Sequence, residues 1–158
     1  MKFTNGSIDD VVIRELKKYV DDRGWLCELF REDELIKEHI PVMSYISVTY
    51  PGITRGPHEH ETQTDYFCFL GPSNFKLCLW DNRKNSKTYG NMMTKYFGED
   101  SPAMVIVPPG VVHGYKNSGI LPGTVVNFPN KLFAGKERKE PVDEVRHESD
   151  PDSPFRID

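Results

Sequence analysis

The sequence lacks several features that would indicate other classes of protein. No apolar run approaches the ~20 residues of a membrane span, and the N-terminus MKFTNGSIDDVV has neither the apolar region nor the cleavage site of a signal peptide. Positive charge is not in excess, because 20 Lys and Arg stand against 24 Asp and Glu. A nucleic-acid surface normally needs such an excess. We therefore expect no membrane or nucleic-acid partner, whereas local arginines can still bind an anionic small molecule.

Cysteine is also scarce. Cys27, Cys68 and Cys78 are odd in number and form no CxxC pair, which argues against a disulfide framework or a zinc site built on cysteine. Cys68 and Cys78 lie in apolar, strand-like runs, where they are expected to be small buried side chains. We therefore expect a cytoplasmic protein. The 158 residues favour one domain, 1–158, with a single core.

Short runs rich in β-branched and aromatic residues make up the middle of the chain, and turn signals such as Pro51-Gly52 and Gly71-Pro72 separate them. Many short strands with regular turns predict an all-β sandwich or barrel. The runs are MSYISVTY (43–50), DYFCFL (65–70), FKLCLW (75–80), AMVIVP (103–108) and TVVNF (124–128).

Two segments depart from this pattern. REDELIKEH (31–39) carries an apolar pair in a charged stretch before Pro41, which predicts a short helix. From residue 135 to 158 the chain is mostly charged, with three prolines, and Phe155 and Ile157 are its candidate anchors. We expect a peripheral C-terminal segment there, with room for one short helix, and not a second domain.

Two histidine motifs carry the candidate chemistry. In RGPHEHETQTDYF (55–67), His58 and His60 are one residue apart and Asp65 follows. Residues i and i+2 of a strand face the same side, so both histidines point into a barrel or both point out. The second motif, PPGVVHGYKN (108–117), contains His113. Metal ligands, proton-transfer groups and hydrogen-bonded core residues all remain open for these side chains.

Together the two motifs resemble the signature motifs of the cupin superfamily over about residues 43–128. The resemblance implies a double-stranded β-helix, or jelly-roll barrel, whose interior holds His58, His60, a carboxylate and His113 around one point. Asp65 stands where metal-binding cupins usually carry glutamate. Three imidazoles and a carboxylate would suit one divalent metal, Fe, Mn, Ni or Zn. A metal-free histidine site is the alternative.

A longer stretch, residues 21–128, resembles one cupin branch, the dTDP-4-dehydrorhamnose 3,5-epimerases. Four segments carry this resemblance in the same order and at similar spacing. They are DDRGWLCELFRED (21–33), TRGPH (54–58), WDNRKNSKTYGN (80–91) and VPPGVVHGY (107–115), which are similar to the family's DxRGxFxExF, LRGLH, D-R-x-x-S-P-T-F/Y-G and IPEGxAHGF stretches.

The resemblance implies the epimerisation of a 4-keto sugar nucleotide. The protons next to the keto group are acidic, so a base removes one, a donor or cation stabilises the enolate, and an acid returns a proton from the opposite face. By resemblance His58 is the base, and Arg23 and Arg55 bind the diphosphate through bidentate donors. The other implied substrate-binding positions are Trp25 near the nucleotide base, Glu28 on the substrate or an arginine, His113 as a second polar group, and Asn127.

Three positions depart from the family pattern. Where the family has a catalytic lysine, this chain has Asp65, and where it has a catalytic tyrosine, this chain has about Asn127. The family's C-terminal aspartate, which orients the histidine, is missing unless Asp143, Asp150 or Asp152 replaces it. An anion beside a developing enolate raises the barrier unless a metal lies between them.

Three hypotheses follow from these observations. The first is a sugar-nucleotide epimerase or isomerase of deoxysugar or surface polysaccharide biosynthesis, without a cofactor. The second is a metal-dependent cupin enzyme, an oxygenase or a lyase, that uses His58, His60, Asp65 and His113 as ligands. In that case His58 is not free to act as the base. The third is a non-catalytic cupin that binds nucleotide sugars. The family resemblance also implies a homodimer in which N-terminal strands cross to the partner.

Overall fold

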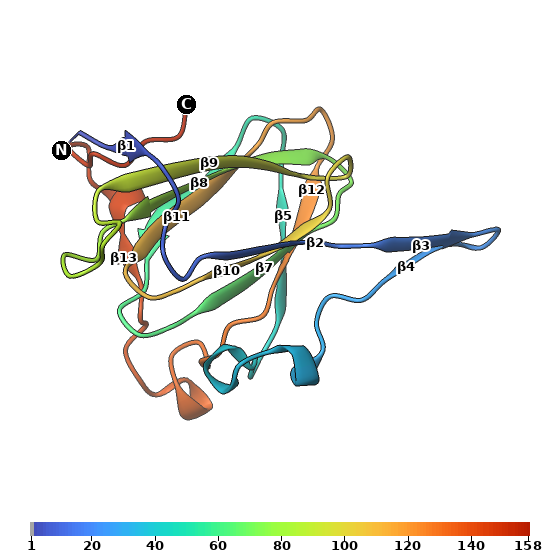
Figure 1. Ribbon diagram of the computed structural model, residues 1–158, viewed down its shortest axis with the longest axis horizontal. Helices are drawn as coiled ribbons and strands as arrows, with labels where there is room; N and C mark the ends of the chain where they lie inside the picture. The colour runs from blue at the N-terminus through green and yellow to red at the C-terminus, as the bar shows by residue number, and fades with distance from the viewer. Residues whose placement is uncertain (1) are drawn as a thin grey trace.

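Two facing β-sheets form the body of the protein in the computed structural model, which describes residues 2–158 (Figure 1). The six-stranded sheet has the order β1 (Thr4–Asn5), β9 (Asn91–Gly98), β8 (Asn74–Asp81), β11 (Val111–Asn117), β6 (Thr54–Glu59) and β13 (Val145–Arg146). The five-stranded sheet has the order β2 (Val12–Glu15), β10 (Ala103–Val107), β7 (Asp65–Phe69), β12 (Gly123–Asn127) and β5 (Tyr45–Thr49). The all-β jelly-roll prediction is confirmed, although the two sheets do not close into one continuous barrel.

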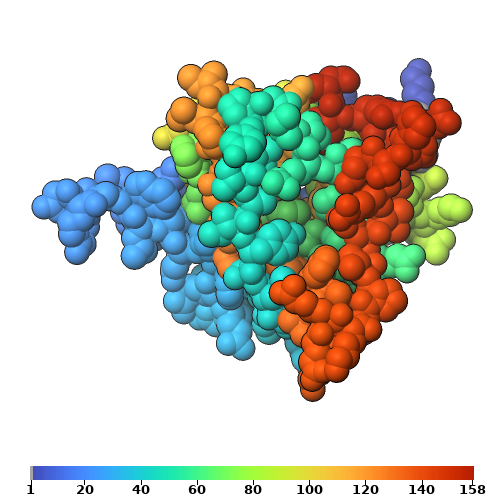
Figure 2. Space-filling model, turned by 180° about the vertical axis from the view of Figure 1, so that it is seen from behind, coloured from blue at the N-terminus to red at the C-terminus, as the bar shows by residue number. Residues whose placement is uncertain are grey.

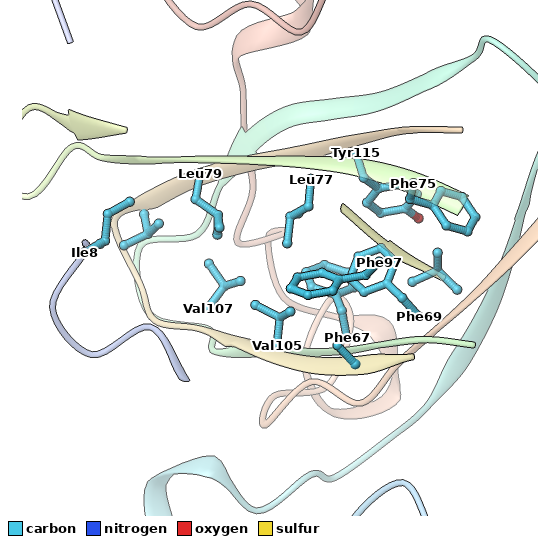
Figure 3. Close-up of a cluster of buried hydrophobic side chains, with 13 residues drawn as sticks. Ile8, Phe67, Phe69, Phe75, Leu77, Leu79, Phe97, Val105, Val107 and Tyr115 are labelled. Atoms are coloured by element: carbon cyan, nitrogen blue, oxygen red, sulfur yellow. The ribbon is translucent and has the colours of Figure 1, made fainter. Parts of the chain in front are cut away.

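The core lies between the sheets, and Figure 3 shows side chains of both sheets meeting there. Because successive strand residues face opposite sides, Leu77 and Leu79 of β8 meet Val105 and Val107 of β10. The alternate residues of β7 and β10 form a second buried cluster on the outer side, where Leu35 and other side chains cover them. Both faces of these strands are therefore buried, which explains why residues 66–69 and 103–107 are continuously apolar.

The predicted strands at 43–50, 65–70, 75–80, 103–108 and 124–128 correspond to β5, β7, β8, β10 and β12. The expected helix over 31–39 consists instead of two separate 3₁₀ turns, η1 (Glu32–Glu34) and η2 (Lys37–His39). Leu35 and Ile36 between them are extended. This backbone lets Leu35 reach the outer cluster while its neighbour stays exposed. No helix in the described part of the chain could cross a membrane.

Two segments leave the body of the sandwich. The hairpin of β3 (Lys18–Asp21) and β4 (Gly24–Cys27) projects away from it (Figures 1 and 2). The C-terminal segment follows the surface through η3 (Lys136–Arg138), β13 and η4 (His147–Ser149). Phe155 anchors it as expected, because this ring is buried against Trp80, and Ile157 is partly buried beside it. The segment is less peripheral than expected, since β13 pairs with β6.

Candidate functional site

A pocket of about 800 Å³ opens between β5, β6 and the C-terminal segment. In Figure 2 these strands, in teal, and the C-terminal segment, in orange to red, lie on either side of the hollow. This volume is within the usual range for small-molecule sites. The pocket wall includes Tyr45, Arg55, His58, His60, Gln63 and Glu144.

The two histidine motifs meet at this pocket. His58 is on β6, His60 directly follows β6, Asp65 begins β7 and His113 is on β11. One ligand atom from each of the four lies within 4.8 Å of the others. The six-stranded sheet brings together residues that are 55 positions apart in the sequence, because His113 pairs directly with His58 across β11 and β6, and Asp65 joins them from the five-stranded sheet.

His60 and His113 hold the buried Asp65 carboxylate between them. Nε2 of each ring lies 3.1 Å from the same oxygen, Oδ2 of Asp65. Nδ1 of His113 donates to the Val111 carbonyl, and Nδ1 of His60 donates to the Asp143 carbonyl. Burial alone would raise the pKa of Asp65, but the hydrogen bonds from the two rings hold it below its usual range. Asp65 is therefore ionised at neutral pH.

His58 differs from the other two rings. Among residues 2–158 it forms no hydrogen bond, and its ring meets those of His60 and His113 edge to face. Its Nδ1 lies 3.8 Å from Oε1 of Glu144. Burial, assisted by the neighbouring His113 ring, lowers the pKa of His58 to about 2. At neutral pH the ring is neutral and has a lone pair that can accept a proton or bind a metal.

Asn127 supports Asp65 and does not line the pocket. Its amide nitrogen donates to Oδ1 of Asp65 at 2.9 Å and to the hydroxyl of Tyr45 at 2.7 Å. Its oxygen accepts the backbone N–H of Tyr66. The Gln63 amide also donates to Oδ1 of Asp65. The carboxylate is thus fully hydrogen-bonded, which is what a buried charge requires.

The predicted diphosphate arginines lie in different places. Arg55 lines the pocket, where it donates to the Thr49 hydroxyl and the Val48 carbonyl. Arg23 is at the tip of the β3–β4 hairpin and pairs with Asp21, its side chain 86% exposed. Trp25 is on the same hairpin, under the Lys18 ammonium.

Glu28 is exposed and pairs with Arg31, which matches the expected role of partner for an arginine. Neither Glu28 nor the two hairpin residues line the pocket of their own chain.

Of the three C-terminal aspartates proposed to orient His58, none faces it. Asp143 comes closest to the site, but its carboxylate accepts the backbone N–H groups of Glu61, Thr62 and Gln63. Glu144 is the carboxylate that lies near His58. This difference follows from β13, where Val145 and Arg146 pair with β6 and so bring the preceding residue to the histidine.

Two pocket residues, Tyr45 and Glu144, are absent from the sequence-based predictions. Tyr45 is the first residue of a strand that was predicted, and alternation with Ser47 indicates which residues share its face. Nothing in the sequence gives the pairing of Tyr45 with Asn127 or of β13 with β6, which are contacts between distant segments.

Comparison with known proteins matches residues 5–119 to the family described as dTDP-4-dehydrorhamnose 3,5-epimerase. The spore coat polysaccharide biosynthesis protein SpsL of Bacillus subtilis is 40% identical over 126 residues, which cover 80% of this chain and 82% of that protein. The probable low-salt glycan biosynthesis epimerase Agl13 of Haloferax volcanii is 38% identical over 129 residues, 80% of this chain and 81% of its own.

Solved structures share the fold at lower identity. The dTDP sugar isomerase of Desulfovibrio desulfuricans G20 has a TM-score of 0.79 at 21% identity, covering 94% of this chain and 91% of its own. A double mutant of ChmJ, a 3'-monoepimerase from Streptomyces bikiniensis in complex with dTDP, has a TM-score of 0.78 at 22% identity, covering all of this chain and 78% of its own.

Proposed function

The chain belongs to the dTDP-4-dehydrorhamnose 3,5-epimerase family, and we propose that it epimerises a dTDP-4-keto-6-deoxyhexose next to the keto group, in surface polysaccharide biosynthesis. The observation that carries the proposal is a neutral histidine, His58, in the wall of a pocket large enough for a sugar nucleotide. Two relatives near 40% identity are named for polysaccharide or glycan biosynthesis, which supports the pathway. A cytoplasmic location stays a prediction.

The proposed reaction begins with His58 as general base. His58 removes a proton from the carbon next to the ketone, and the electrons of the broken C–H bond move onto the keto oxygen as an enolate. A ring whose pKa is low accepts the proton only if the new charge is compensated, and Glu144 is the carboxylate placed to do so. Arg55 is placed to bind the anionic diphosphate.

A second proposal concerns a divalent metal. The donor set fits one, because His60, Asp65 and His113 form a two-histidine, one-carboxylate group. The Nδ1 atoms of both rings are held by backbone carbonyls, as in most metal-binding histidines. A metal bound there would supply a Lewis acid for the keto oxygen, or serve an oxygenase or lyase. These three ligands leave the lone pair of His58 free, whereas a four-ligand site would use it.

Metal analysis separates the three-ligand set from the four-ligand set. We expect about one divalent metal per purified chain if the site is a metal centre. Asp65→Asn should lose it under either arrangement. His58→Asn should retain it if three ligands suffice, and should lose it if His58 is the fourth. Metal at trace level in the wild-type protein would contradict this second proposal and leave the epimerase proposal in place.

We also propose a homodimer. The β3–β4 hairpin exposes Val20, Trp25 and Leu26, and it carries Arg23 outside the pocket of its own chain. A second copy is the partner that would cover these apolar side chains and receive Arg23 at its diphosphate site. The family resemblance of this segment implies the same exchange.

Complementation tests the exchange. We would mix Arg23→Ala and His58→Asn proteins after mild unfolding and refolding. If Arg23 acts across the dimer, half of the dimers are mixed and each has one intact site, so about a quarter of wild-type activity returns. If Arg23 acts within its own chain, every site in a mixed dimer keeps a defect, and no activity returns.

Deuterium exchange tests the epimerase proposal itself. The protein, with and without EDTA treatment, would be incubated in D2O with dTDP-4-keto-6-deoxyglucose and followed by NMR. We expect deuterium at C3 or C5, with His58→Asn at least about 100-fold slower and His39→Gln, outside the pocket, unchanged. Exchange lost only with EDTA would place a metal in the reaction. No exchange, with dTDP still bound, would favour the non-catalytic hypothesis.

A further inference from the structure

The phenol of Tyr45 enters the pocket from the sheet opposite to His58. Tyr45 begins β5 at the edge of the five-stranded sheet, and His58 is on β6 in the six-stranded sheet. Both side chains line the pocket. A planar enolate bound between them would therefore present one face to the imidazole and the other face to the phenol.

The hydrogen bonds around Tyr45 leave its hydroxyl hydrogen available. The phenol oxygen accepts a hydrogen bond from the Asn127 amide at 2.7 Å. This amide cannot accept the phenolic hydrogen, because NH₂ is a donor only. Among residues 2–158 no acceptor takes that hydrogen. Asn127 is itself fixed by Asp65 and by the Tyr66 backbone, so the phenol oxygen is held in one place.

Two other neutral proton donors of the pocket, Tyr115 and Gln63, are occupied. The hydroxyl of Tyr115, on the six-stranded sheet, is bonded to Ser47 at 2.7 Å. The Gln63 amide is bonded to Asp65. Tyr45 is therefore the neutral acid of the five-stranded sheet that faces the substrate space.

We propose that Tyr45 is the general acid that inverts the substrate carbon. After His58 has taken the proton and the enolate has formed, the enolate carbon takes the phenolic hydrogen from the opposite face. The new C–H bond forms as the O–H bond of Tyr45 breaks, and the carbonyl is restored. The phenolate regains a proton from water, and the imidazolium loses one to water, so the cycle is balanced.

The environment of Tyr45 keeps its phenol protonated. Burial and the nearby Asp65 carboxylate raise the pKa of Tyr45 above its ordinary value. The phenol is consequently protonated at neutral pH before each turnover. The hydrogen bond from Asn127 to the phenol oxygen stabilises the phenolate that forms when the proton leaves.

This inference rests on the proposed epimerase function, and the Tyr45→Phe protein tests it. Deuterium entry and product inversion would be measured by NMR in the same sample. Without the phenol, His58 can still remove a proton and return a deuteron to the same face. We therefore expect exchange within about threefold of wild type and inversion at least 100-fold slower. Tyr50→Phe, on the exposed loop after β5, is the matched control and should change neither rate.

The ratio of the inversion rate to the exchange rate decides between a catalytic and a structural role of Tyr45. A purely structural role of Tyr45 would lower both rates together and leave the ratio unchanged, which would overturn the assignment, as would normal inversion by Tyr45→Phe. If that variant does not fold, Tyr45→Gln replaces it, because its amide oxygen can accept the hydrogen bond from Asn127 but cannot supply a proton. No exchange by the wild-type protein would instead overturn the epimerase proposal, and the assignment of Tyr45 with it.

Discussion

Asp143→Ala should loosen the wall of the pocket and lower the stability of the protein. The Asp143 carboxylate accepts three consecutive backbone N–H groups, from Glu61, Thr62 and Gln63, at 2.7 to 2.9 Å. It also accepts the Thr62 hydroxyl. This one side chain joins the C-terminal segment to the loop between His60 and Asp65, which forms part of the pocket wall. Its removal leaves three N–H groups that alanine cannot satisfy.

The expected loss can be estimated from these contacts. A carboxylate that caps backbone N–H groups contributes about 0.5–2 kcal/mol, and charge-assisted bonds in buried positions contribute more. Glu61 and Thr62 are exposed, so water replaces part of what is lost, whereas Gln63 is half-buried. We expect Asp143→Ala to lower the free energy of unfolding by about 2–3 kcal/mol. Asp152→Ala, at an exposed position of the same segment, should change it by less than about 0.5 kcal/mol.

Urea unfolding at two pH values checks this estimate. Burial would raise the pKa of Asp143, but its hydrogen bonds lower it below the ordinary 3.8. A depressed pKa means that the contribution is present at neutral pH and is lost as the pH falls below 3.8. The wild type and Asp143→Ala should differ at pH 7 and converge in acid. Equal stabilities at pH 7, or a difference that persists in acid, would refute the capping role.

Further changes have distinct readouts. Glu144→Gln should lower kcat about tenfold with little change in KM, since Glu144 acts on the His58 charge and not on the nucleotide. Asp81 is fully buried between Arg83, Ser86 and Thr88, and its pKa is lowered to about 2, so Asp81→Asn should cost about 2 kcal/mol in urea unfolding. That loss should vanish as the pH falls from 3.8 through 2, and dTDP binding should be unchanged. Phe155→Ala should cost about 3 kcal/mol by the same assay, because the ring fills a buried site against Trp80.

Much of the fold follows from local sequence. The runs at 65–70, 75–80 and 103–108 are apolar except for Asp65 and Lys76, and they become largely buried strands. The segment at 31–39 is different, because its propensity favours a helix while the outer cluster requires Leu35 in an extended chain. Tertiary packing decided the outcome there. Charged residues from 135 to 158 gave no indication that β13 would join a sheet, since a two-residue strand has no detectable pattern.

Some residues of the candidate site were also predictable from the sequence, and others were not. The cupin resemblance of the two motifs implied that His58, His60 and His113 lie around one point, and the structure places them together. Tyr45 and Glu144 reach the pocket through pairings of distant strands, which depend on register and not on composition. The placement of Arg23 outside the pocket likewise depends on the β3–β4 hairpin, which projects from the body of the sandwich.

Asp65 stands where the family has a lysine, and two histidine rings hold its carboxylate. Nδ1 of His60 and of His113 faces a carbonyl, and Nε2 of each faces Oδ2 of Asp65. A protonated Asp65 could satisfy only one of these Nε2 contacts. Asp65 is ionised, because these contacts keep its pKa below the ordinary value. Under the metal proposal, a divalent cation held by His60, Asp65 and His113 would supply the positive charge that the family takes from its lysine. His58 would then keep the lone pair that the proton transfer needs.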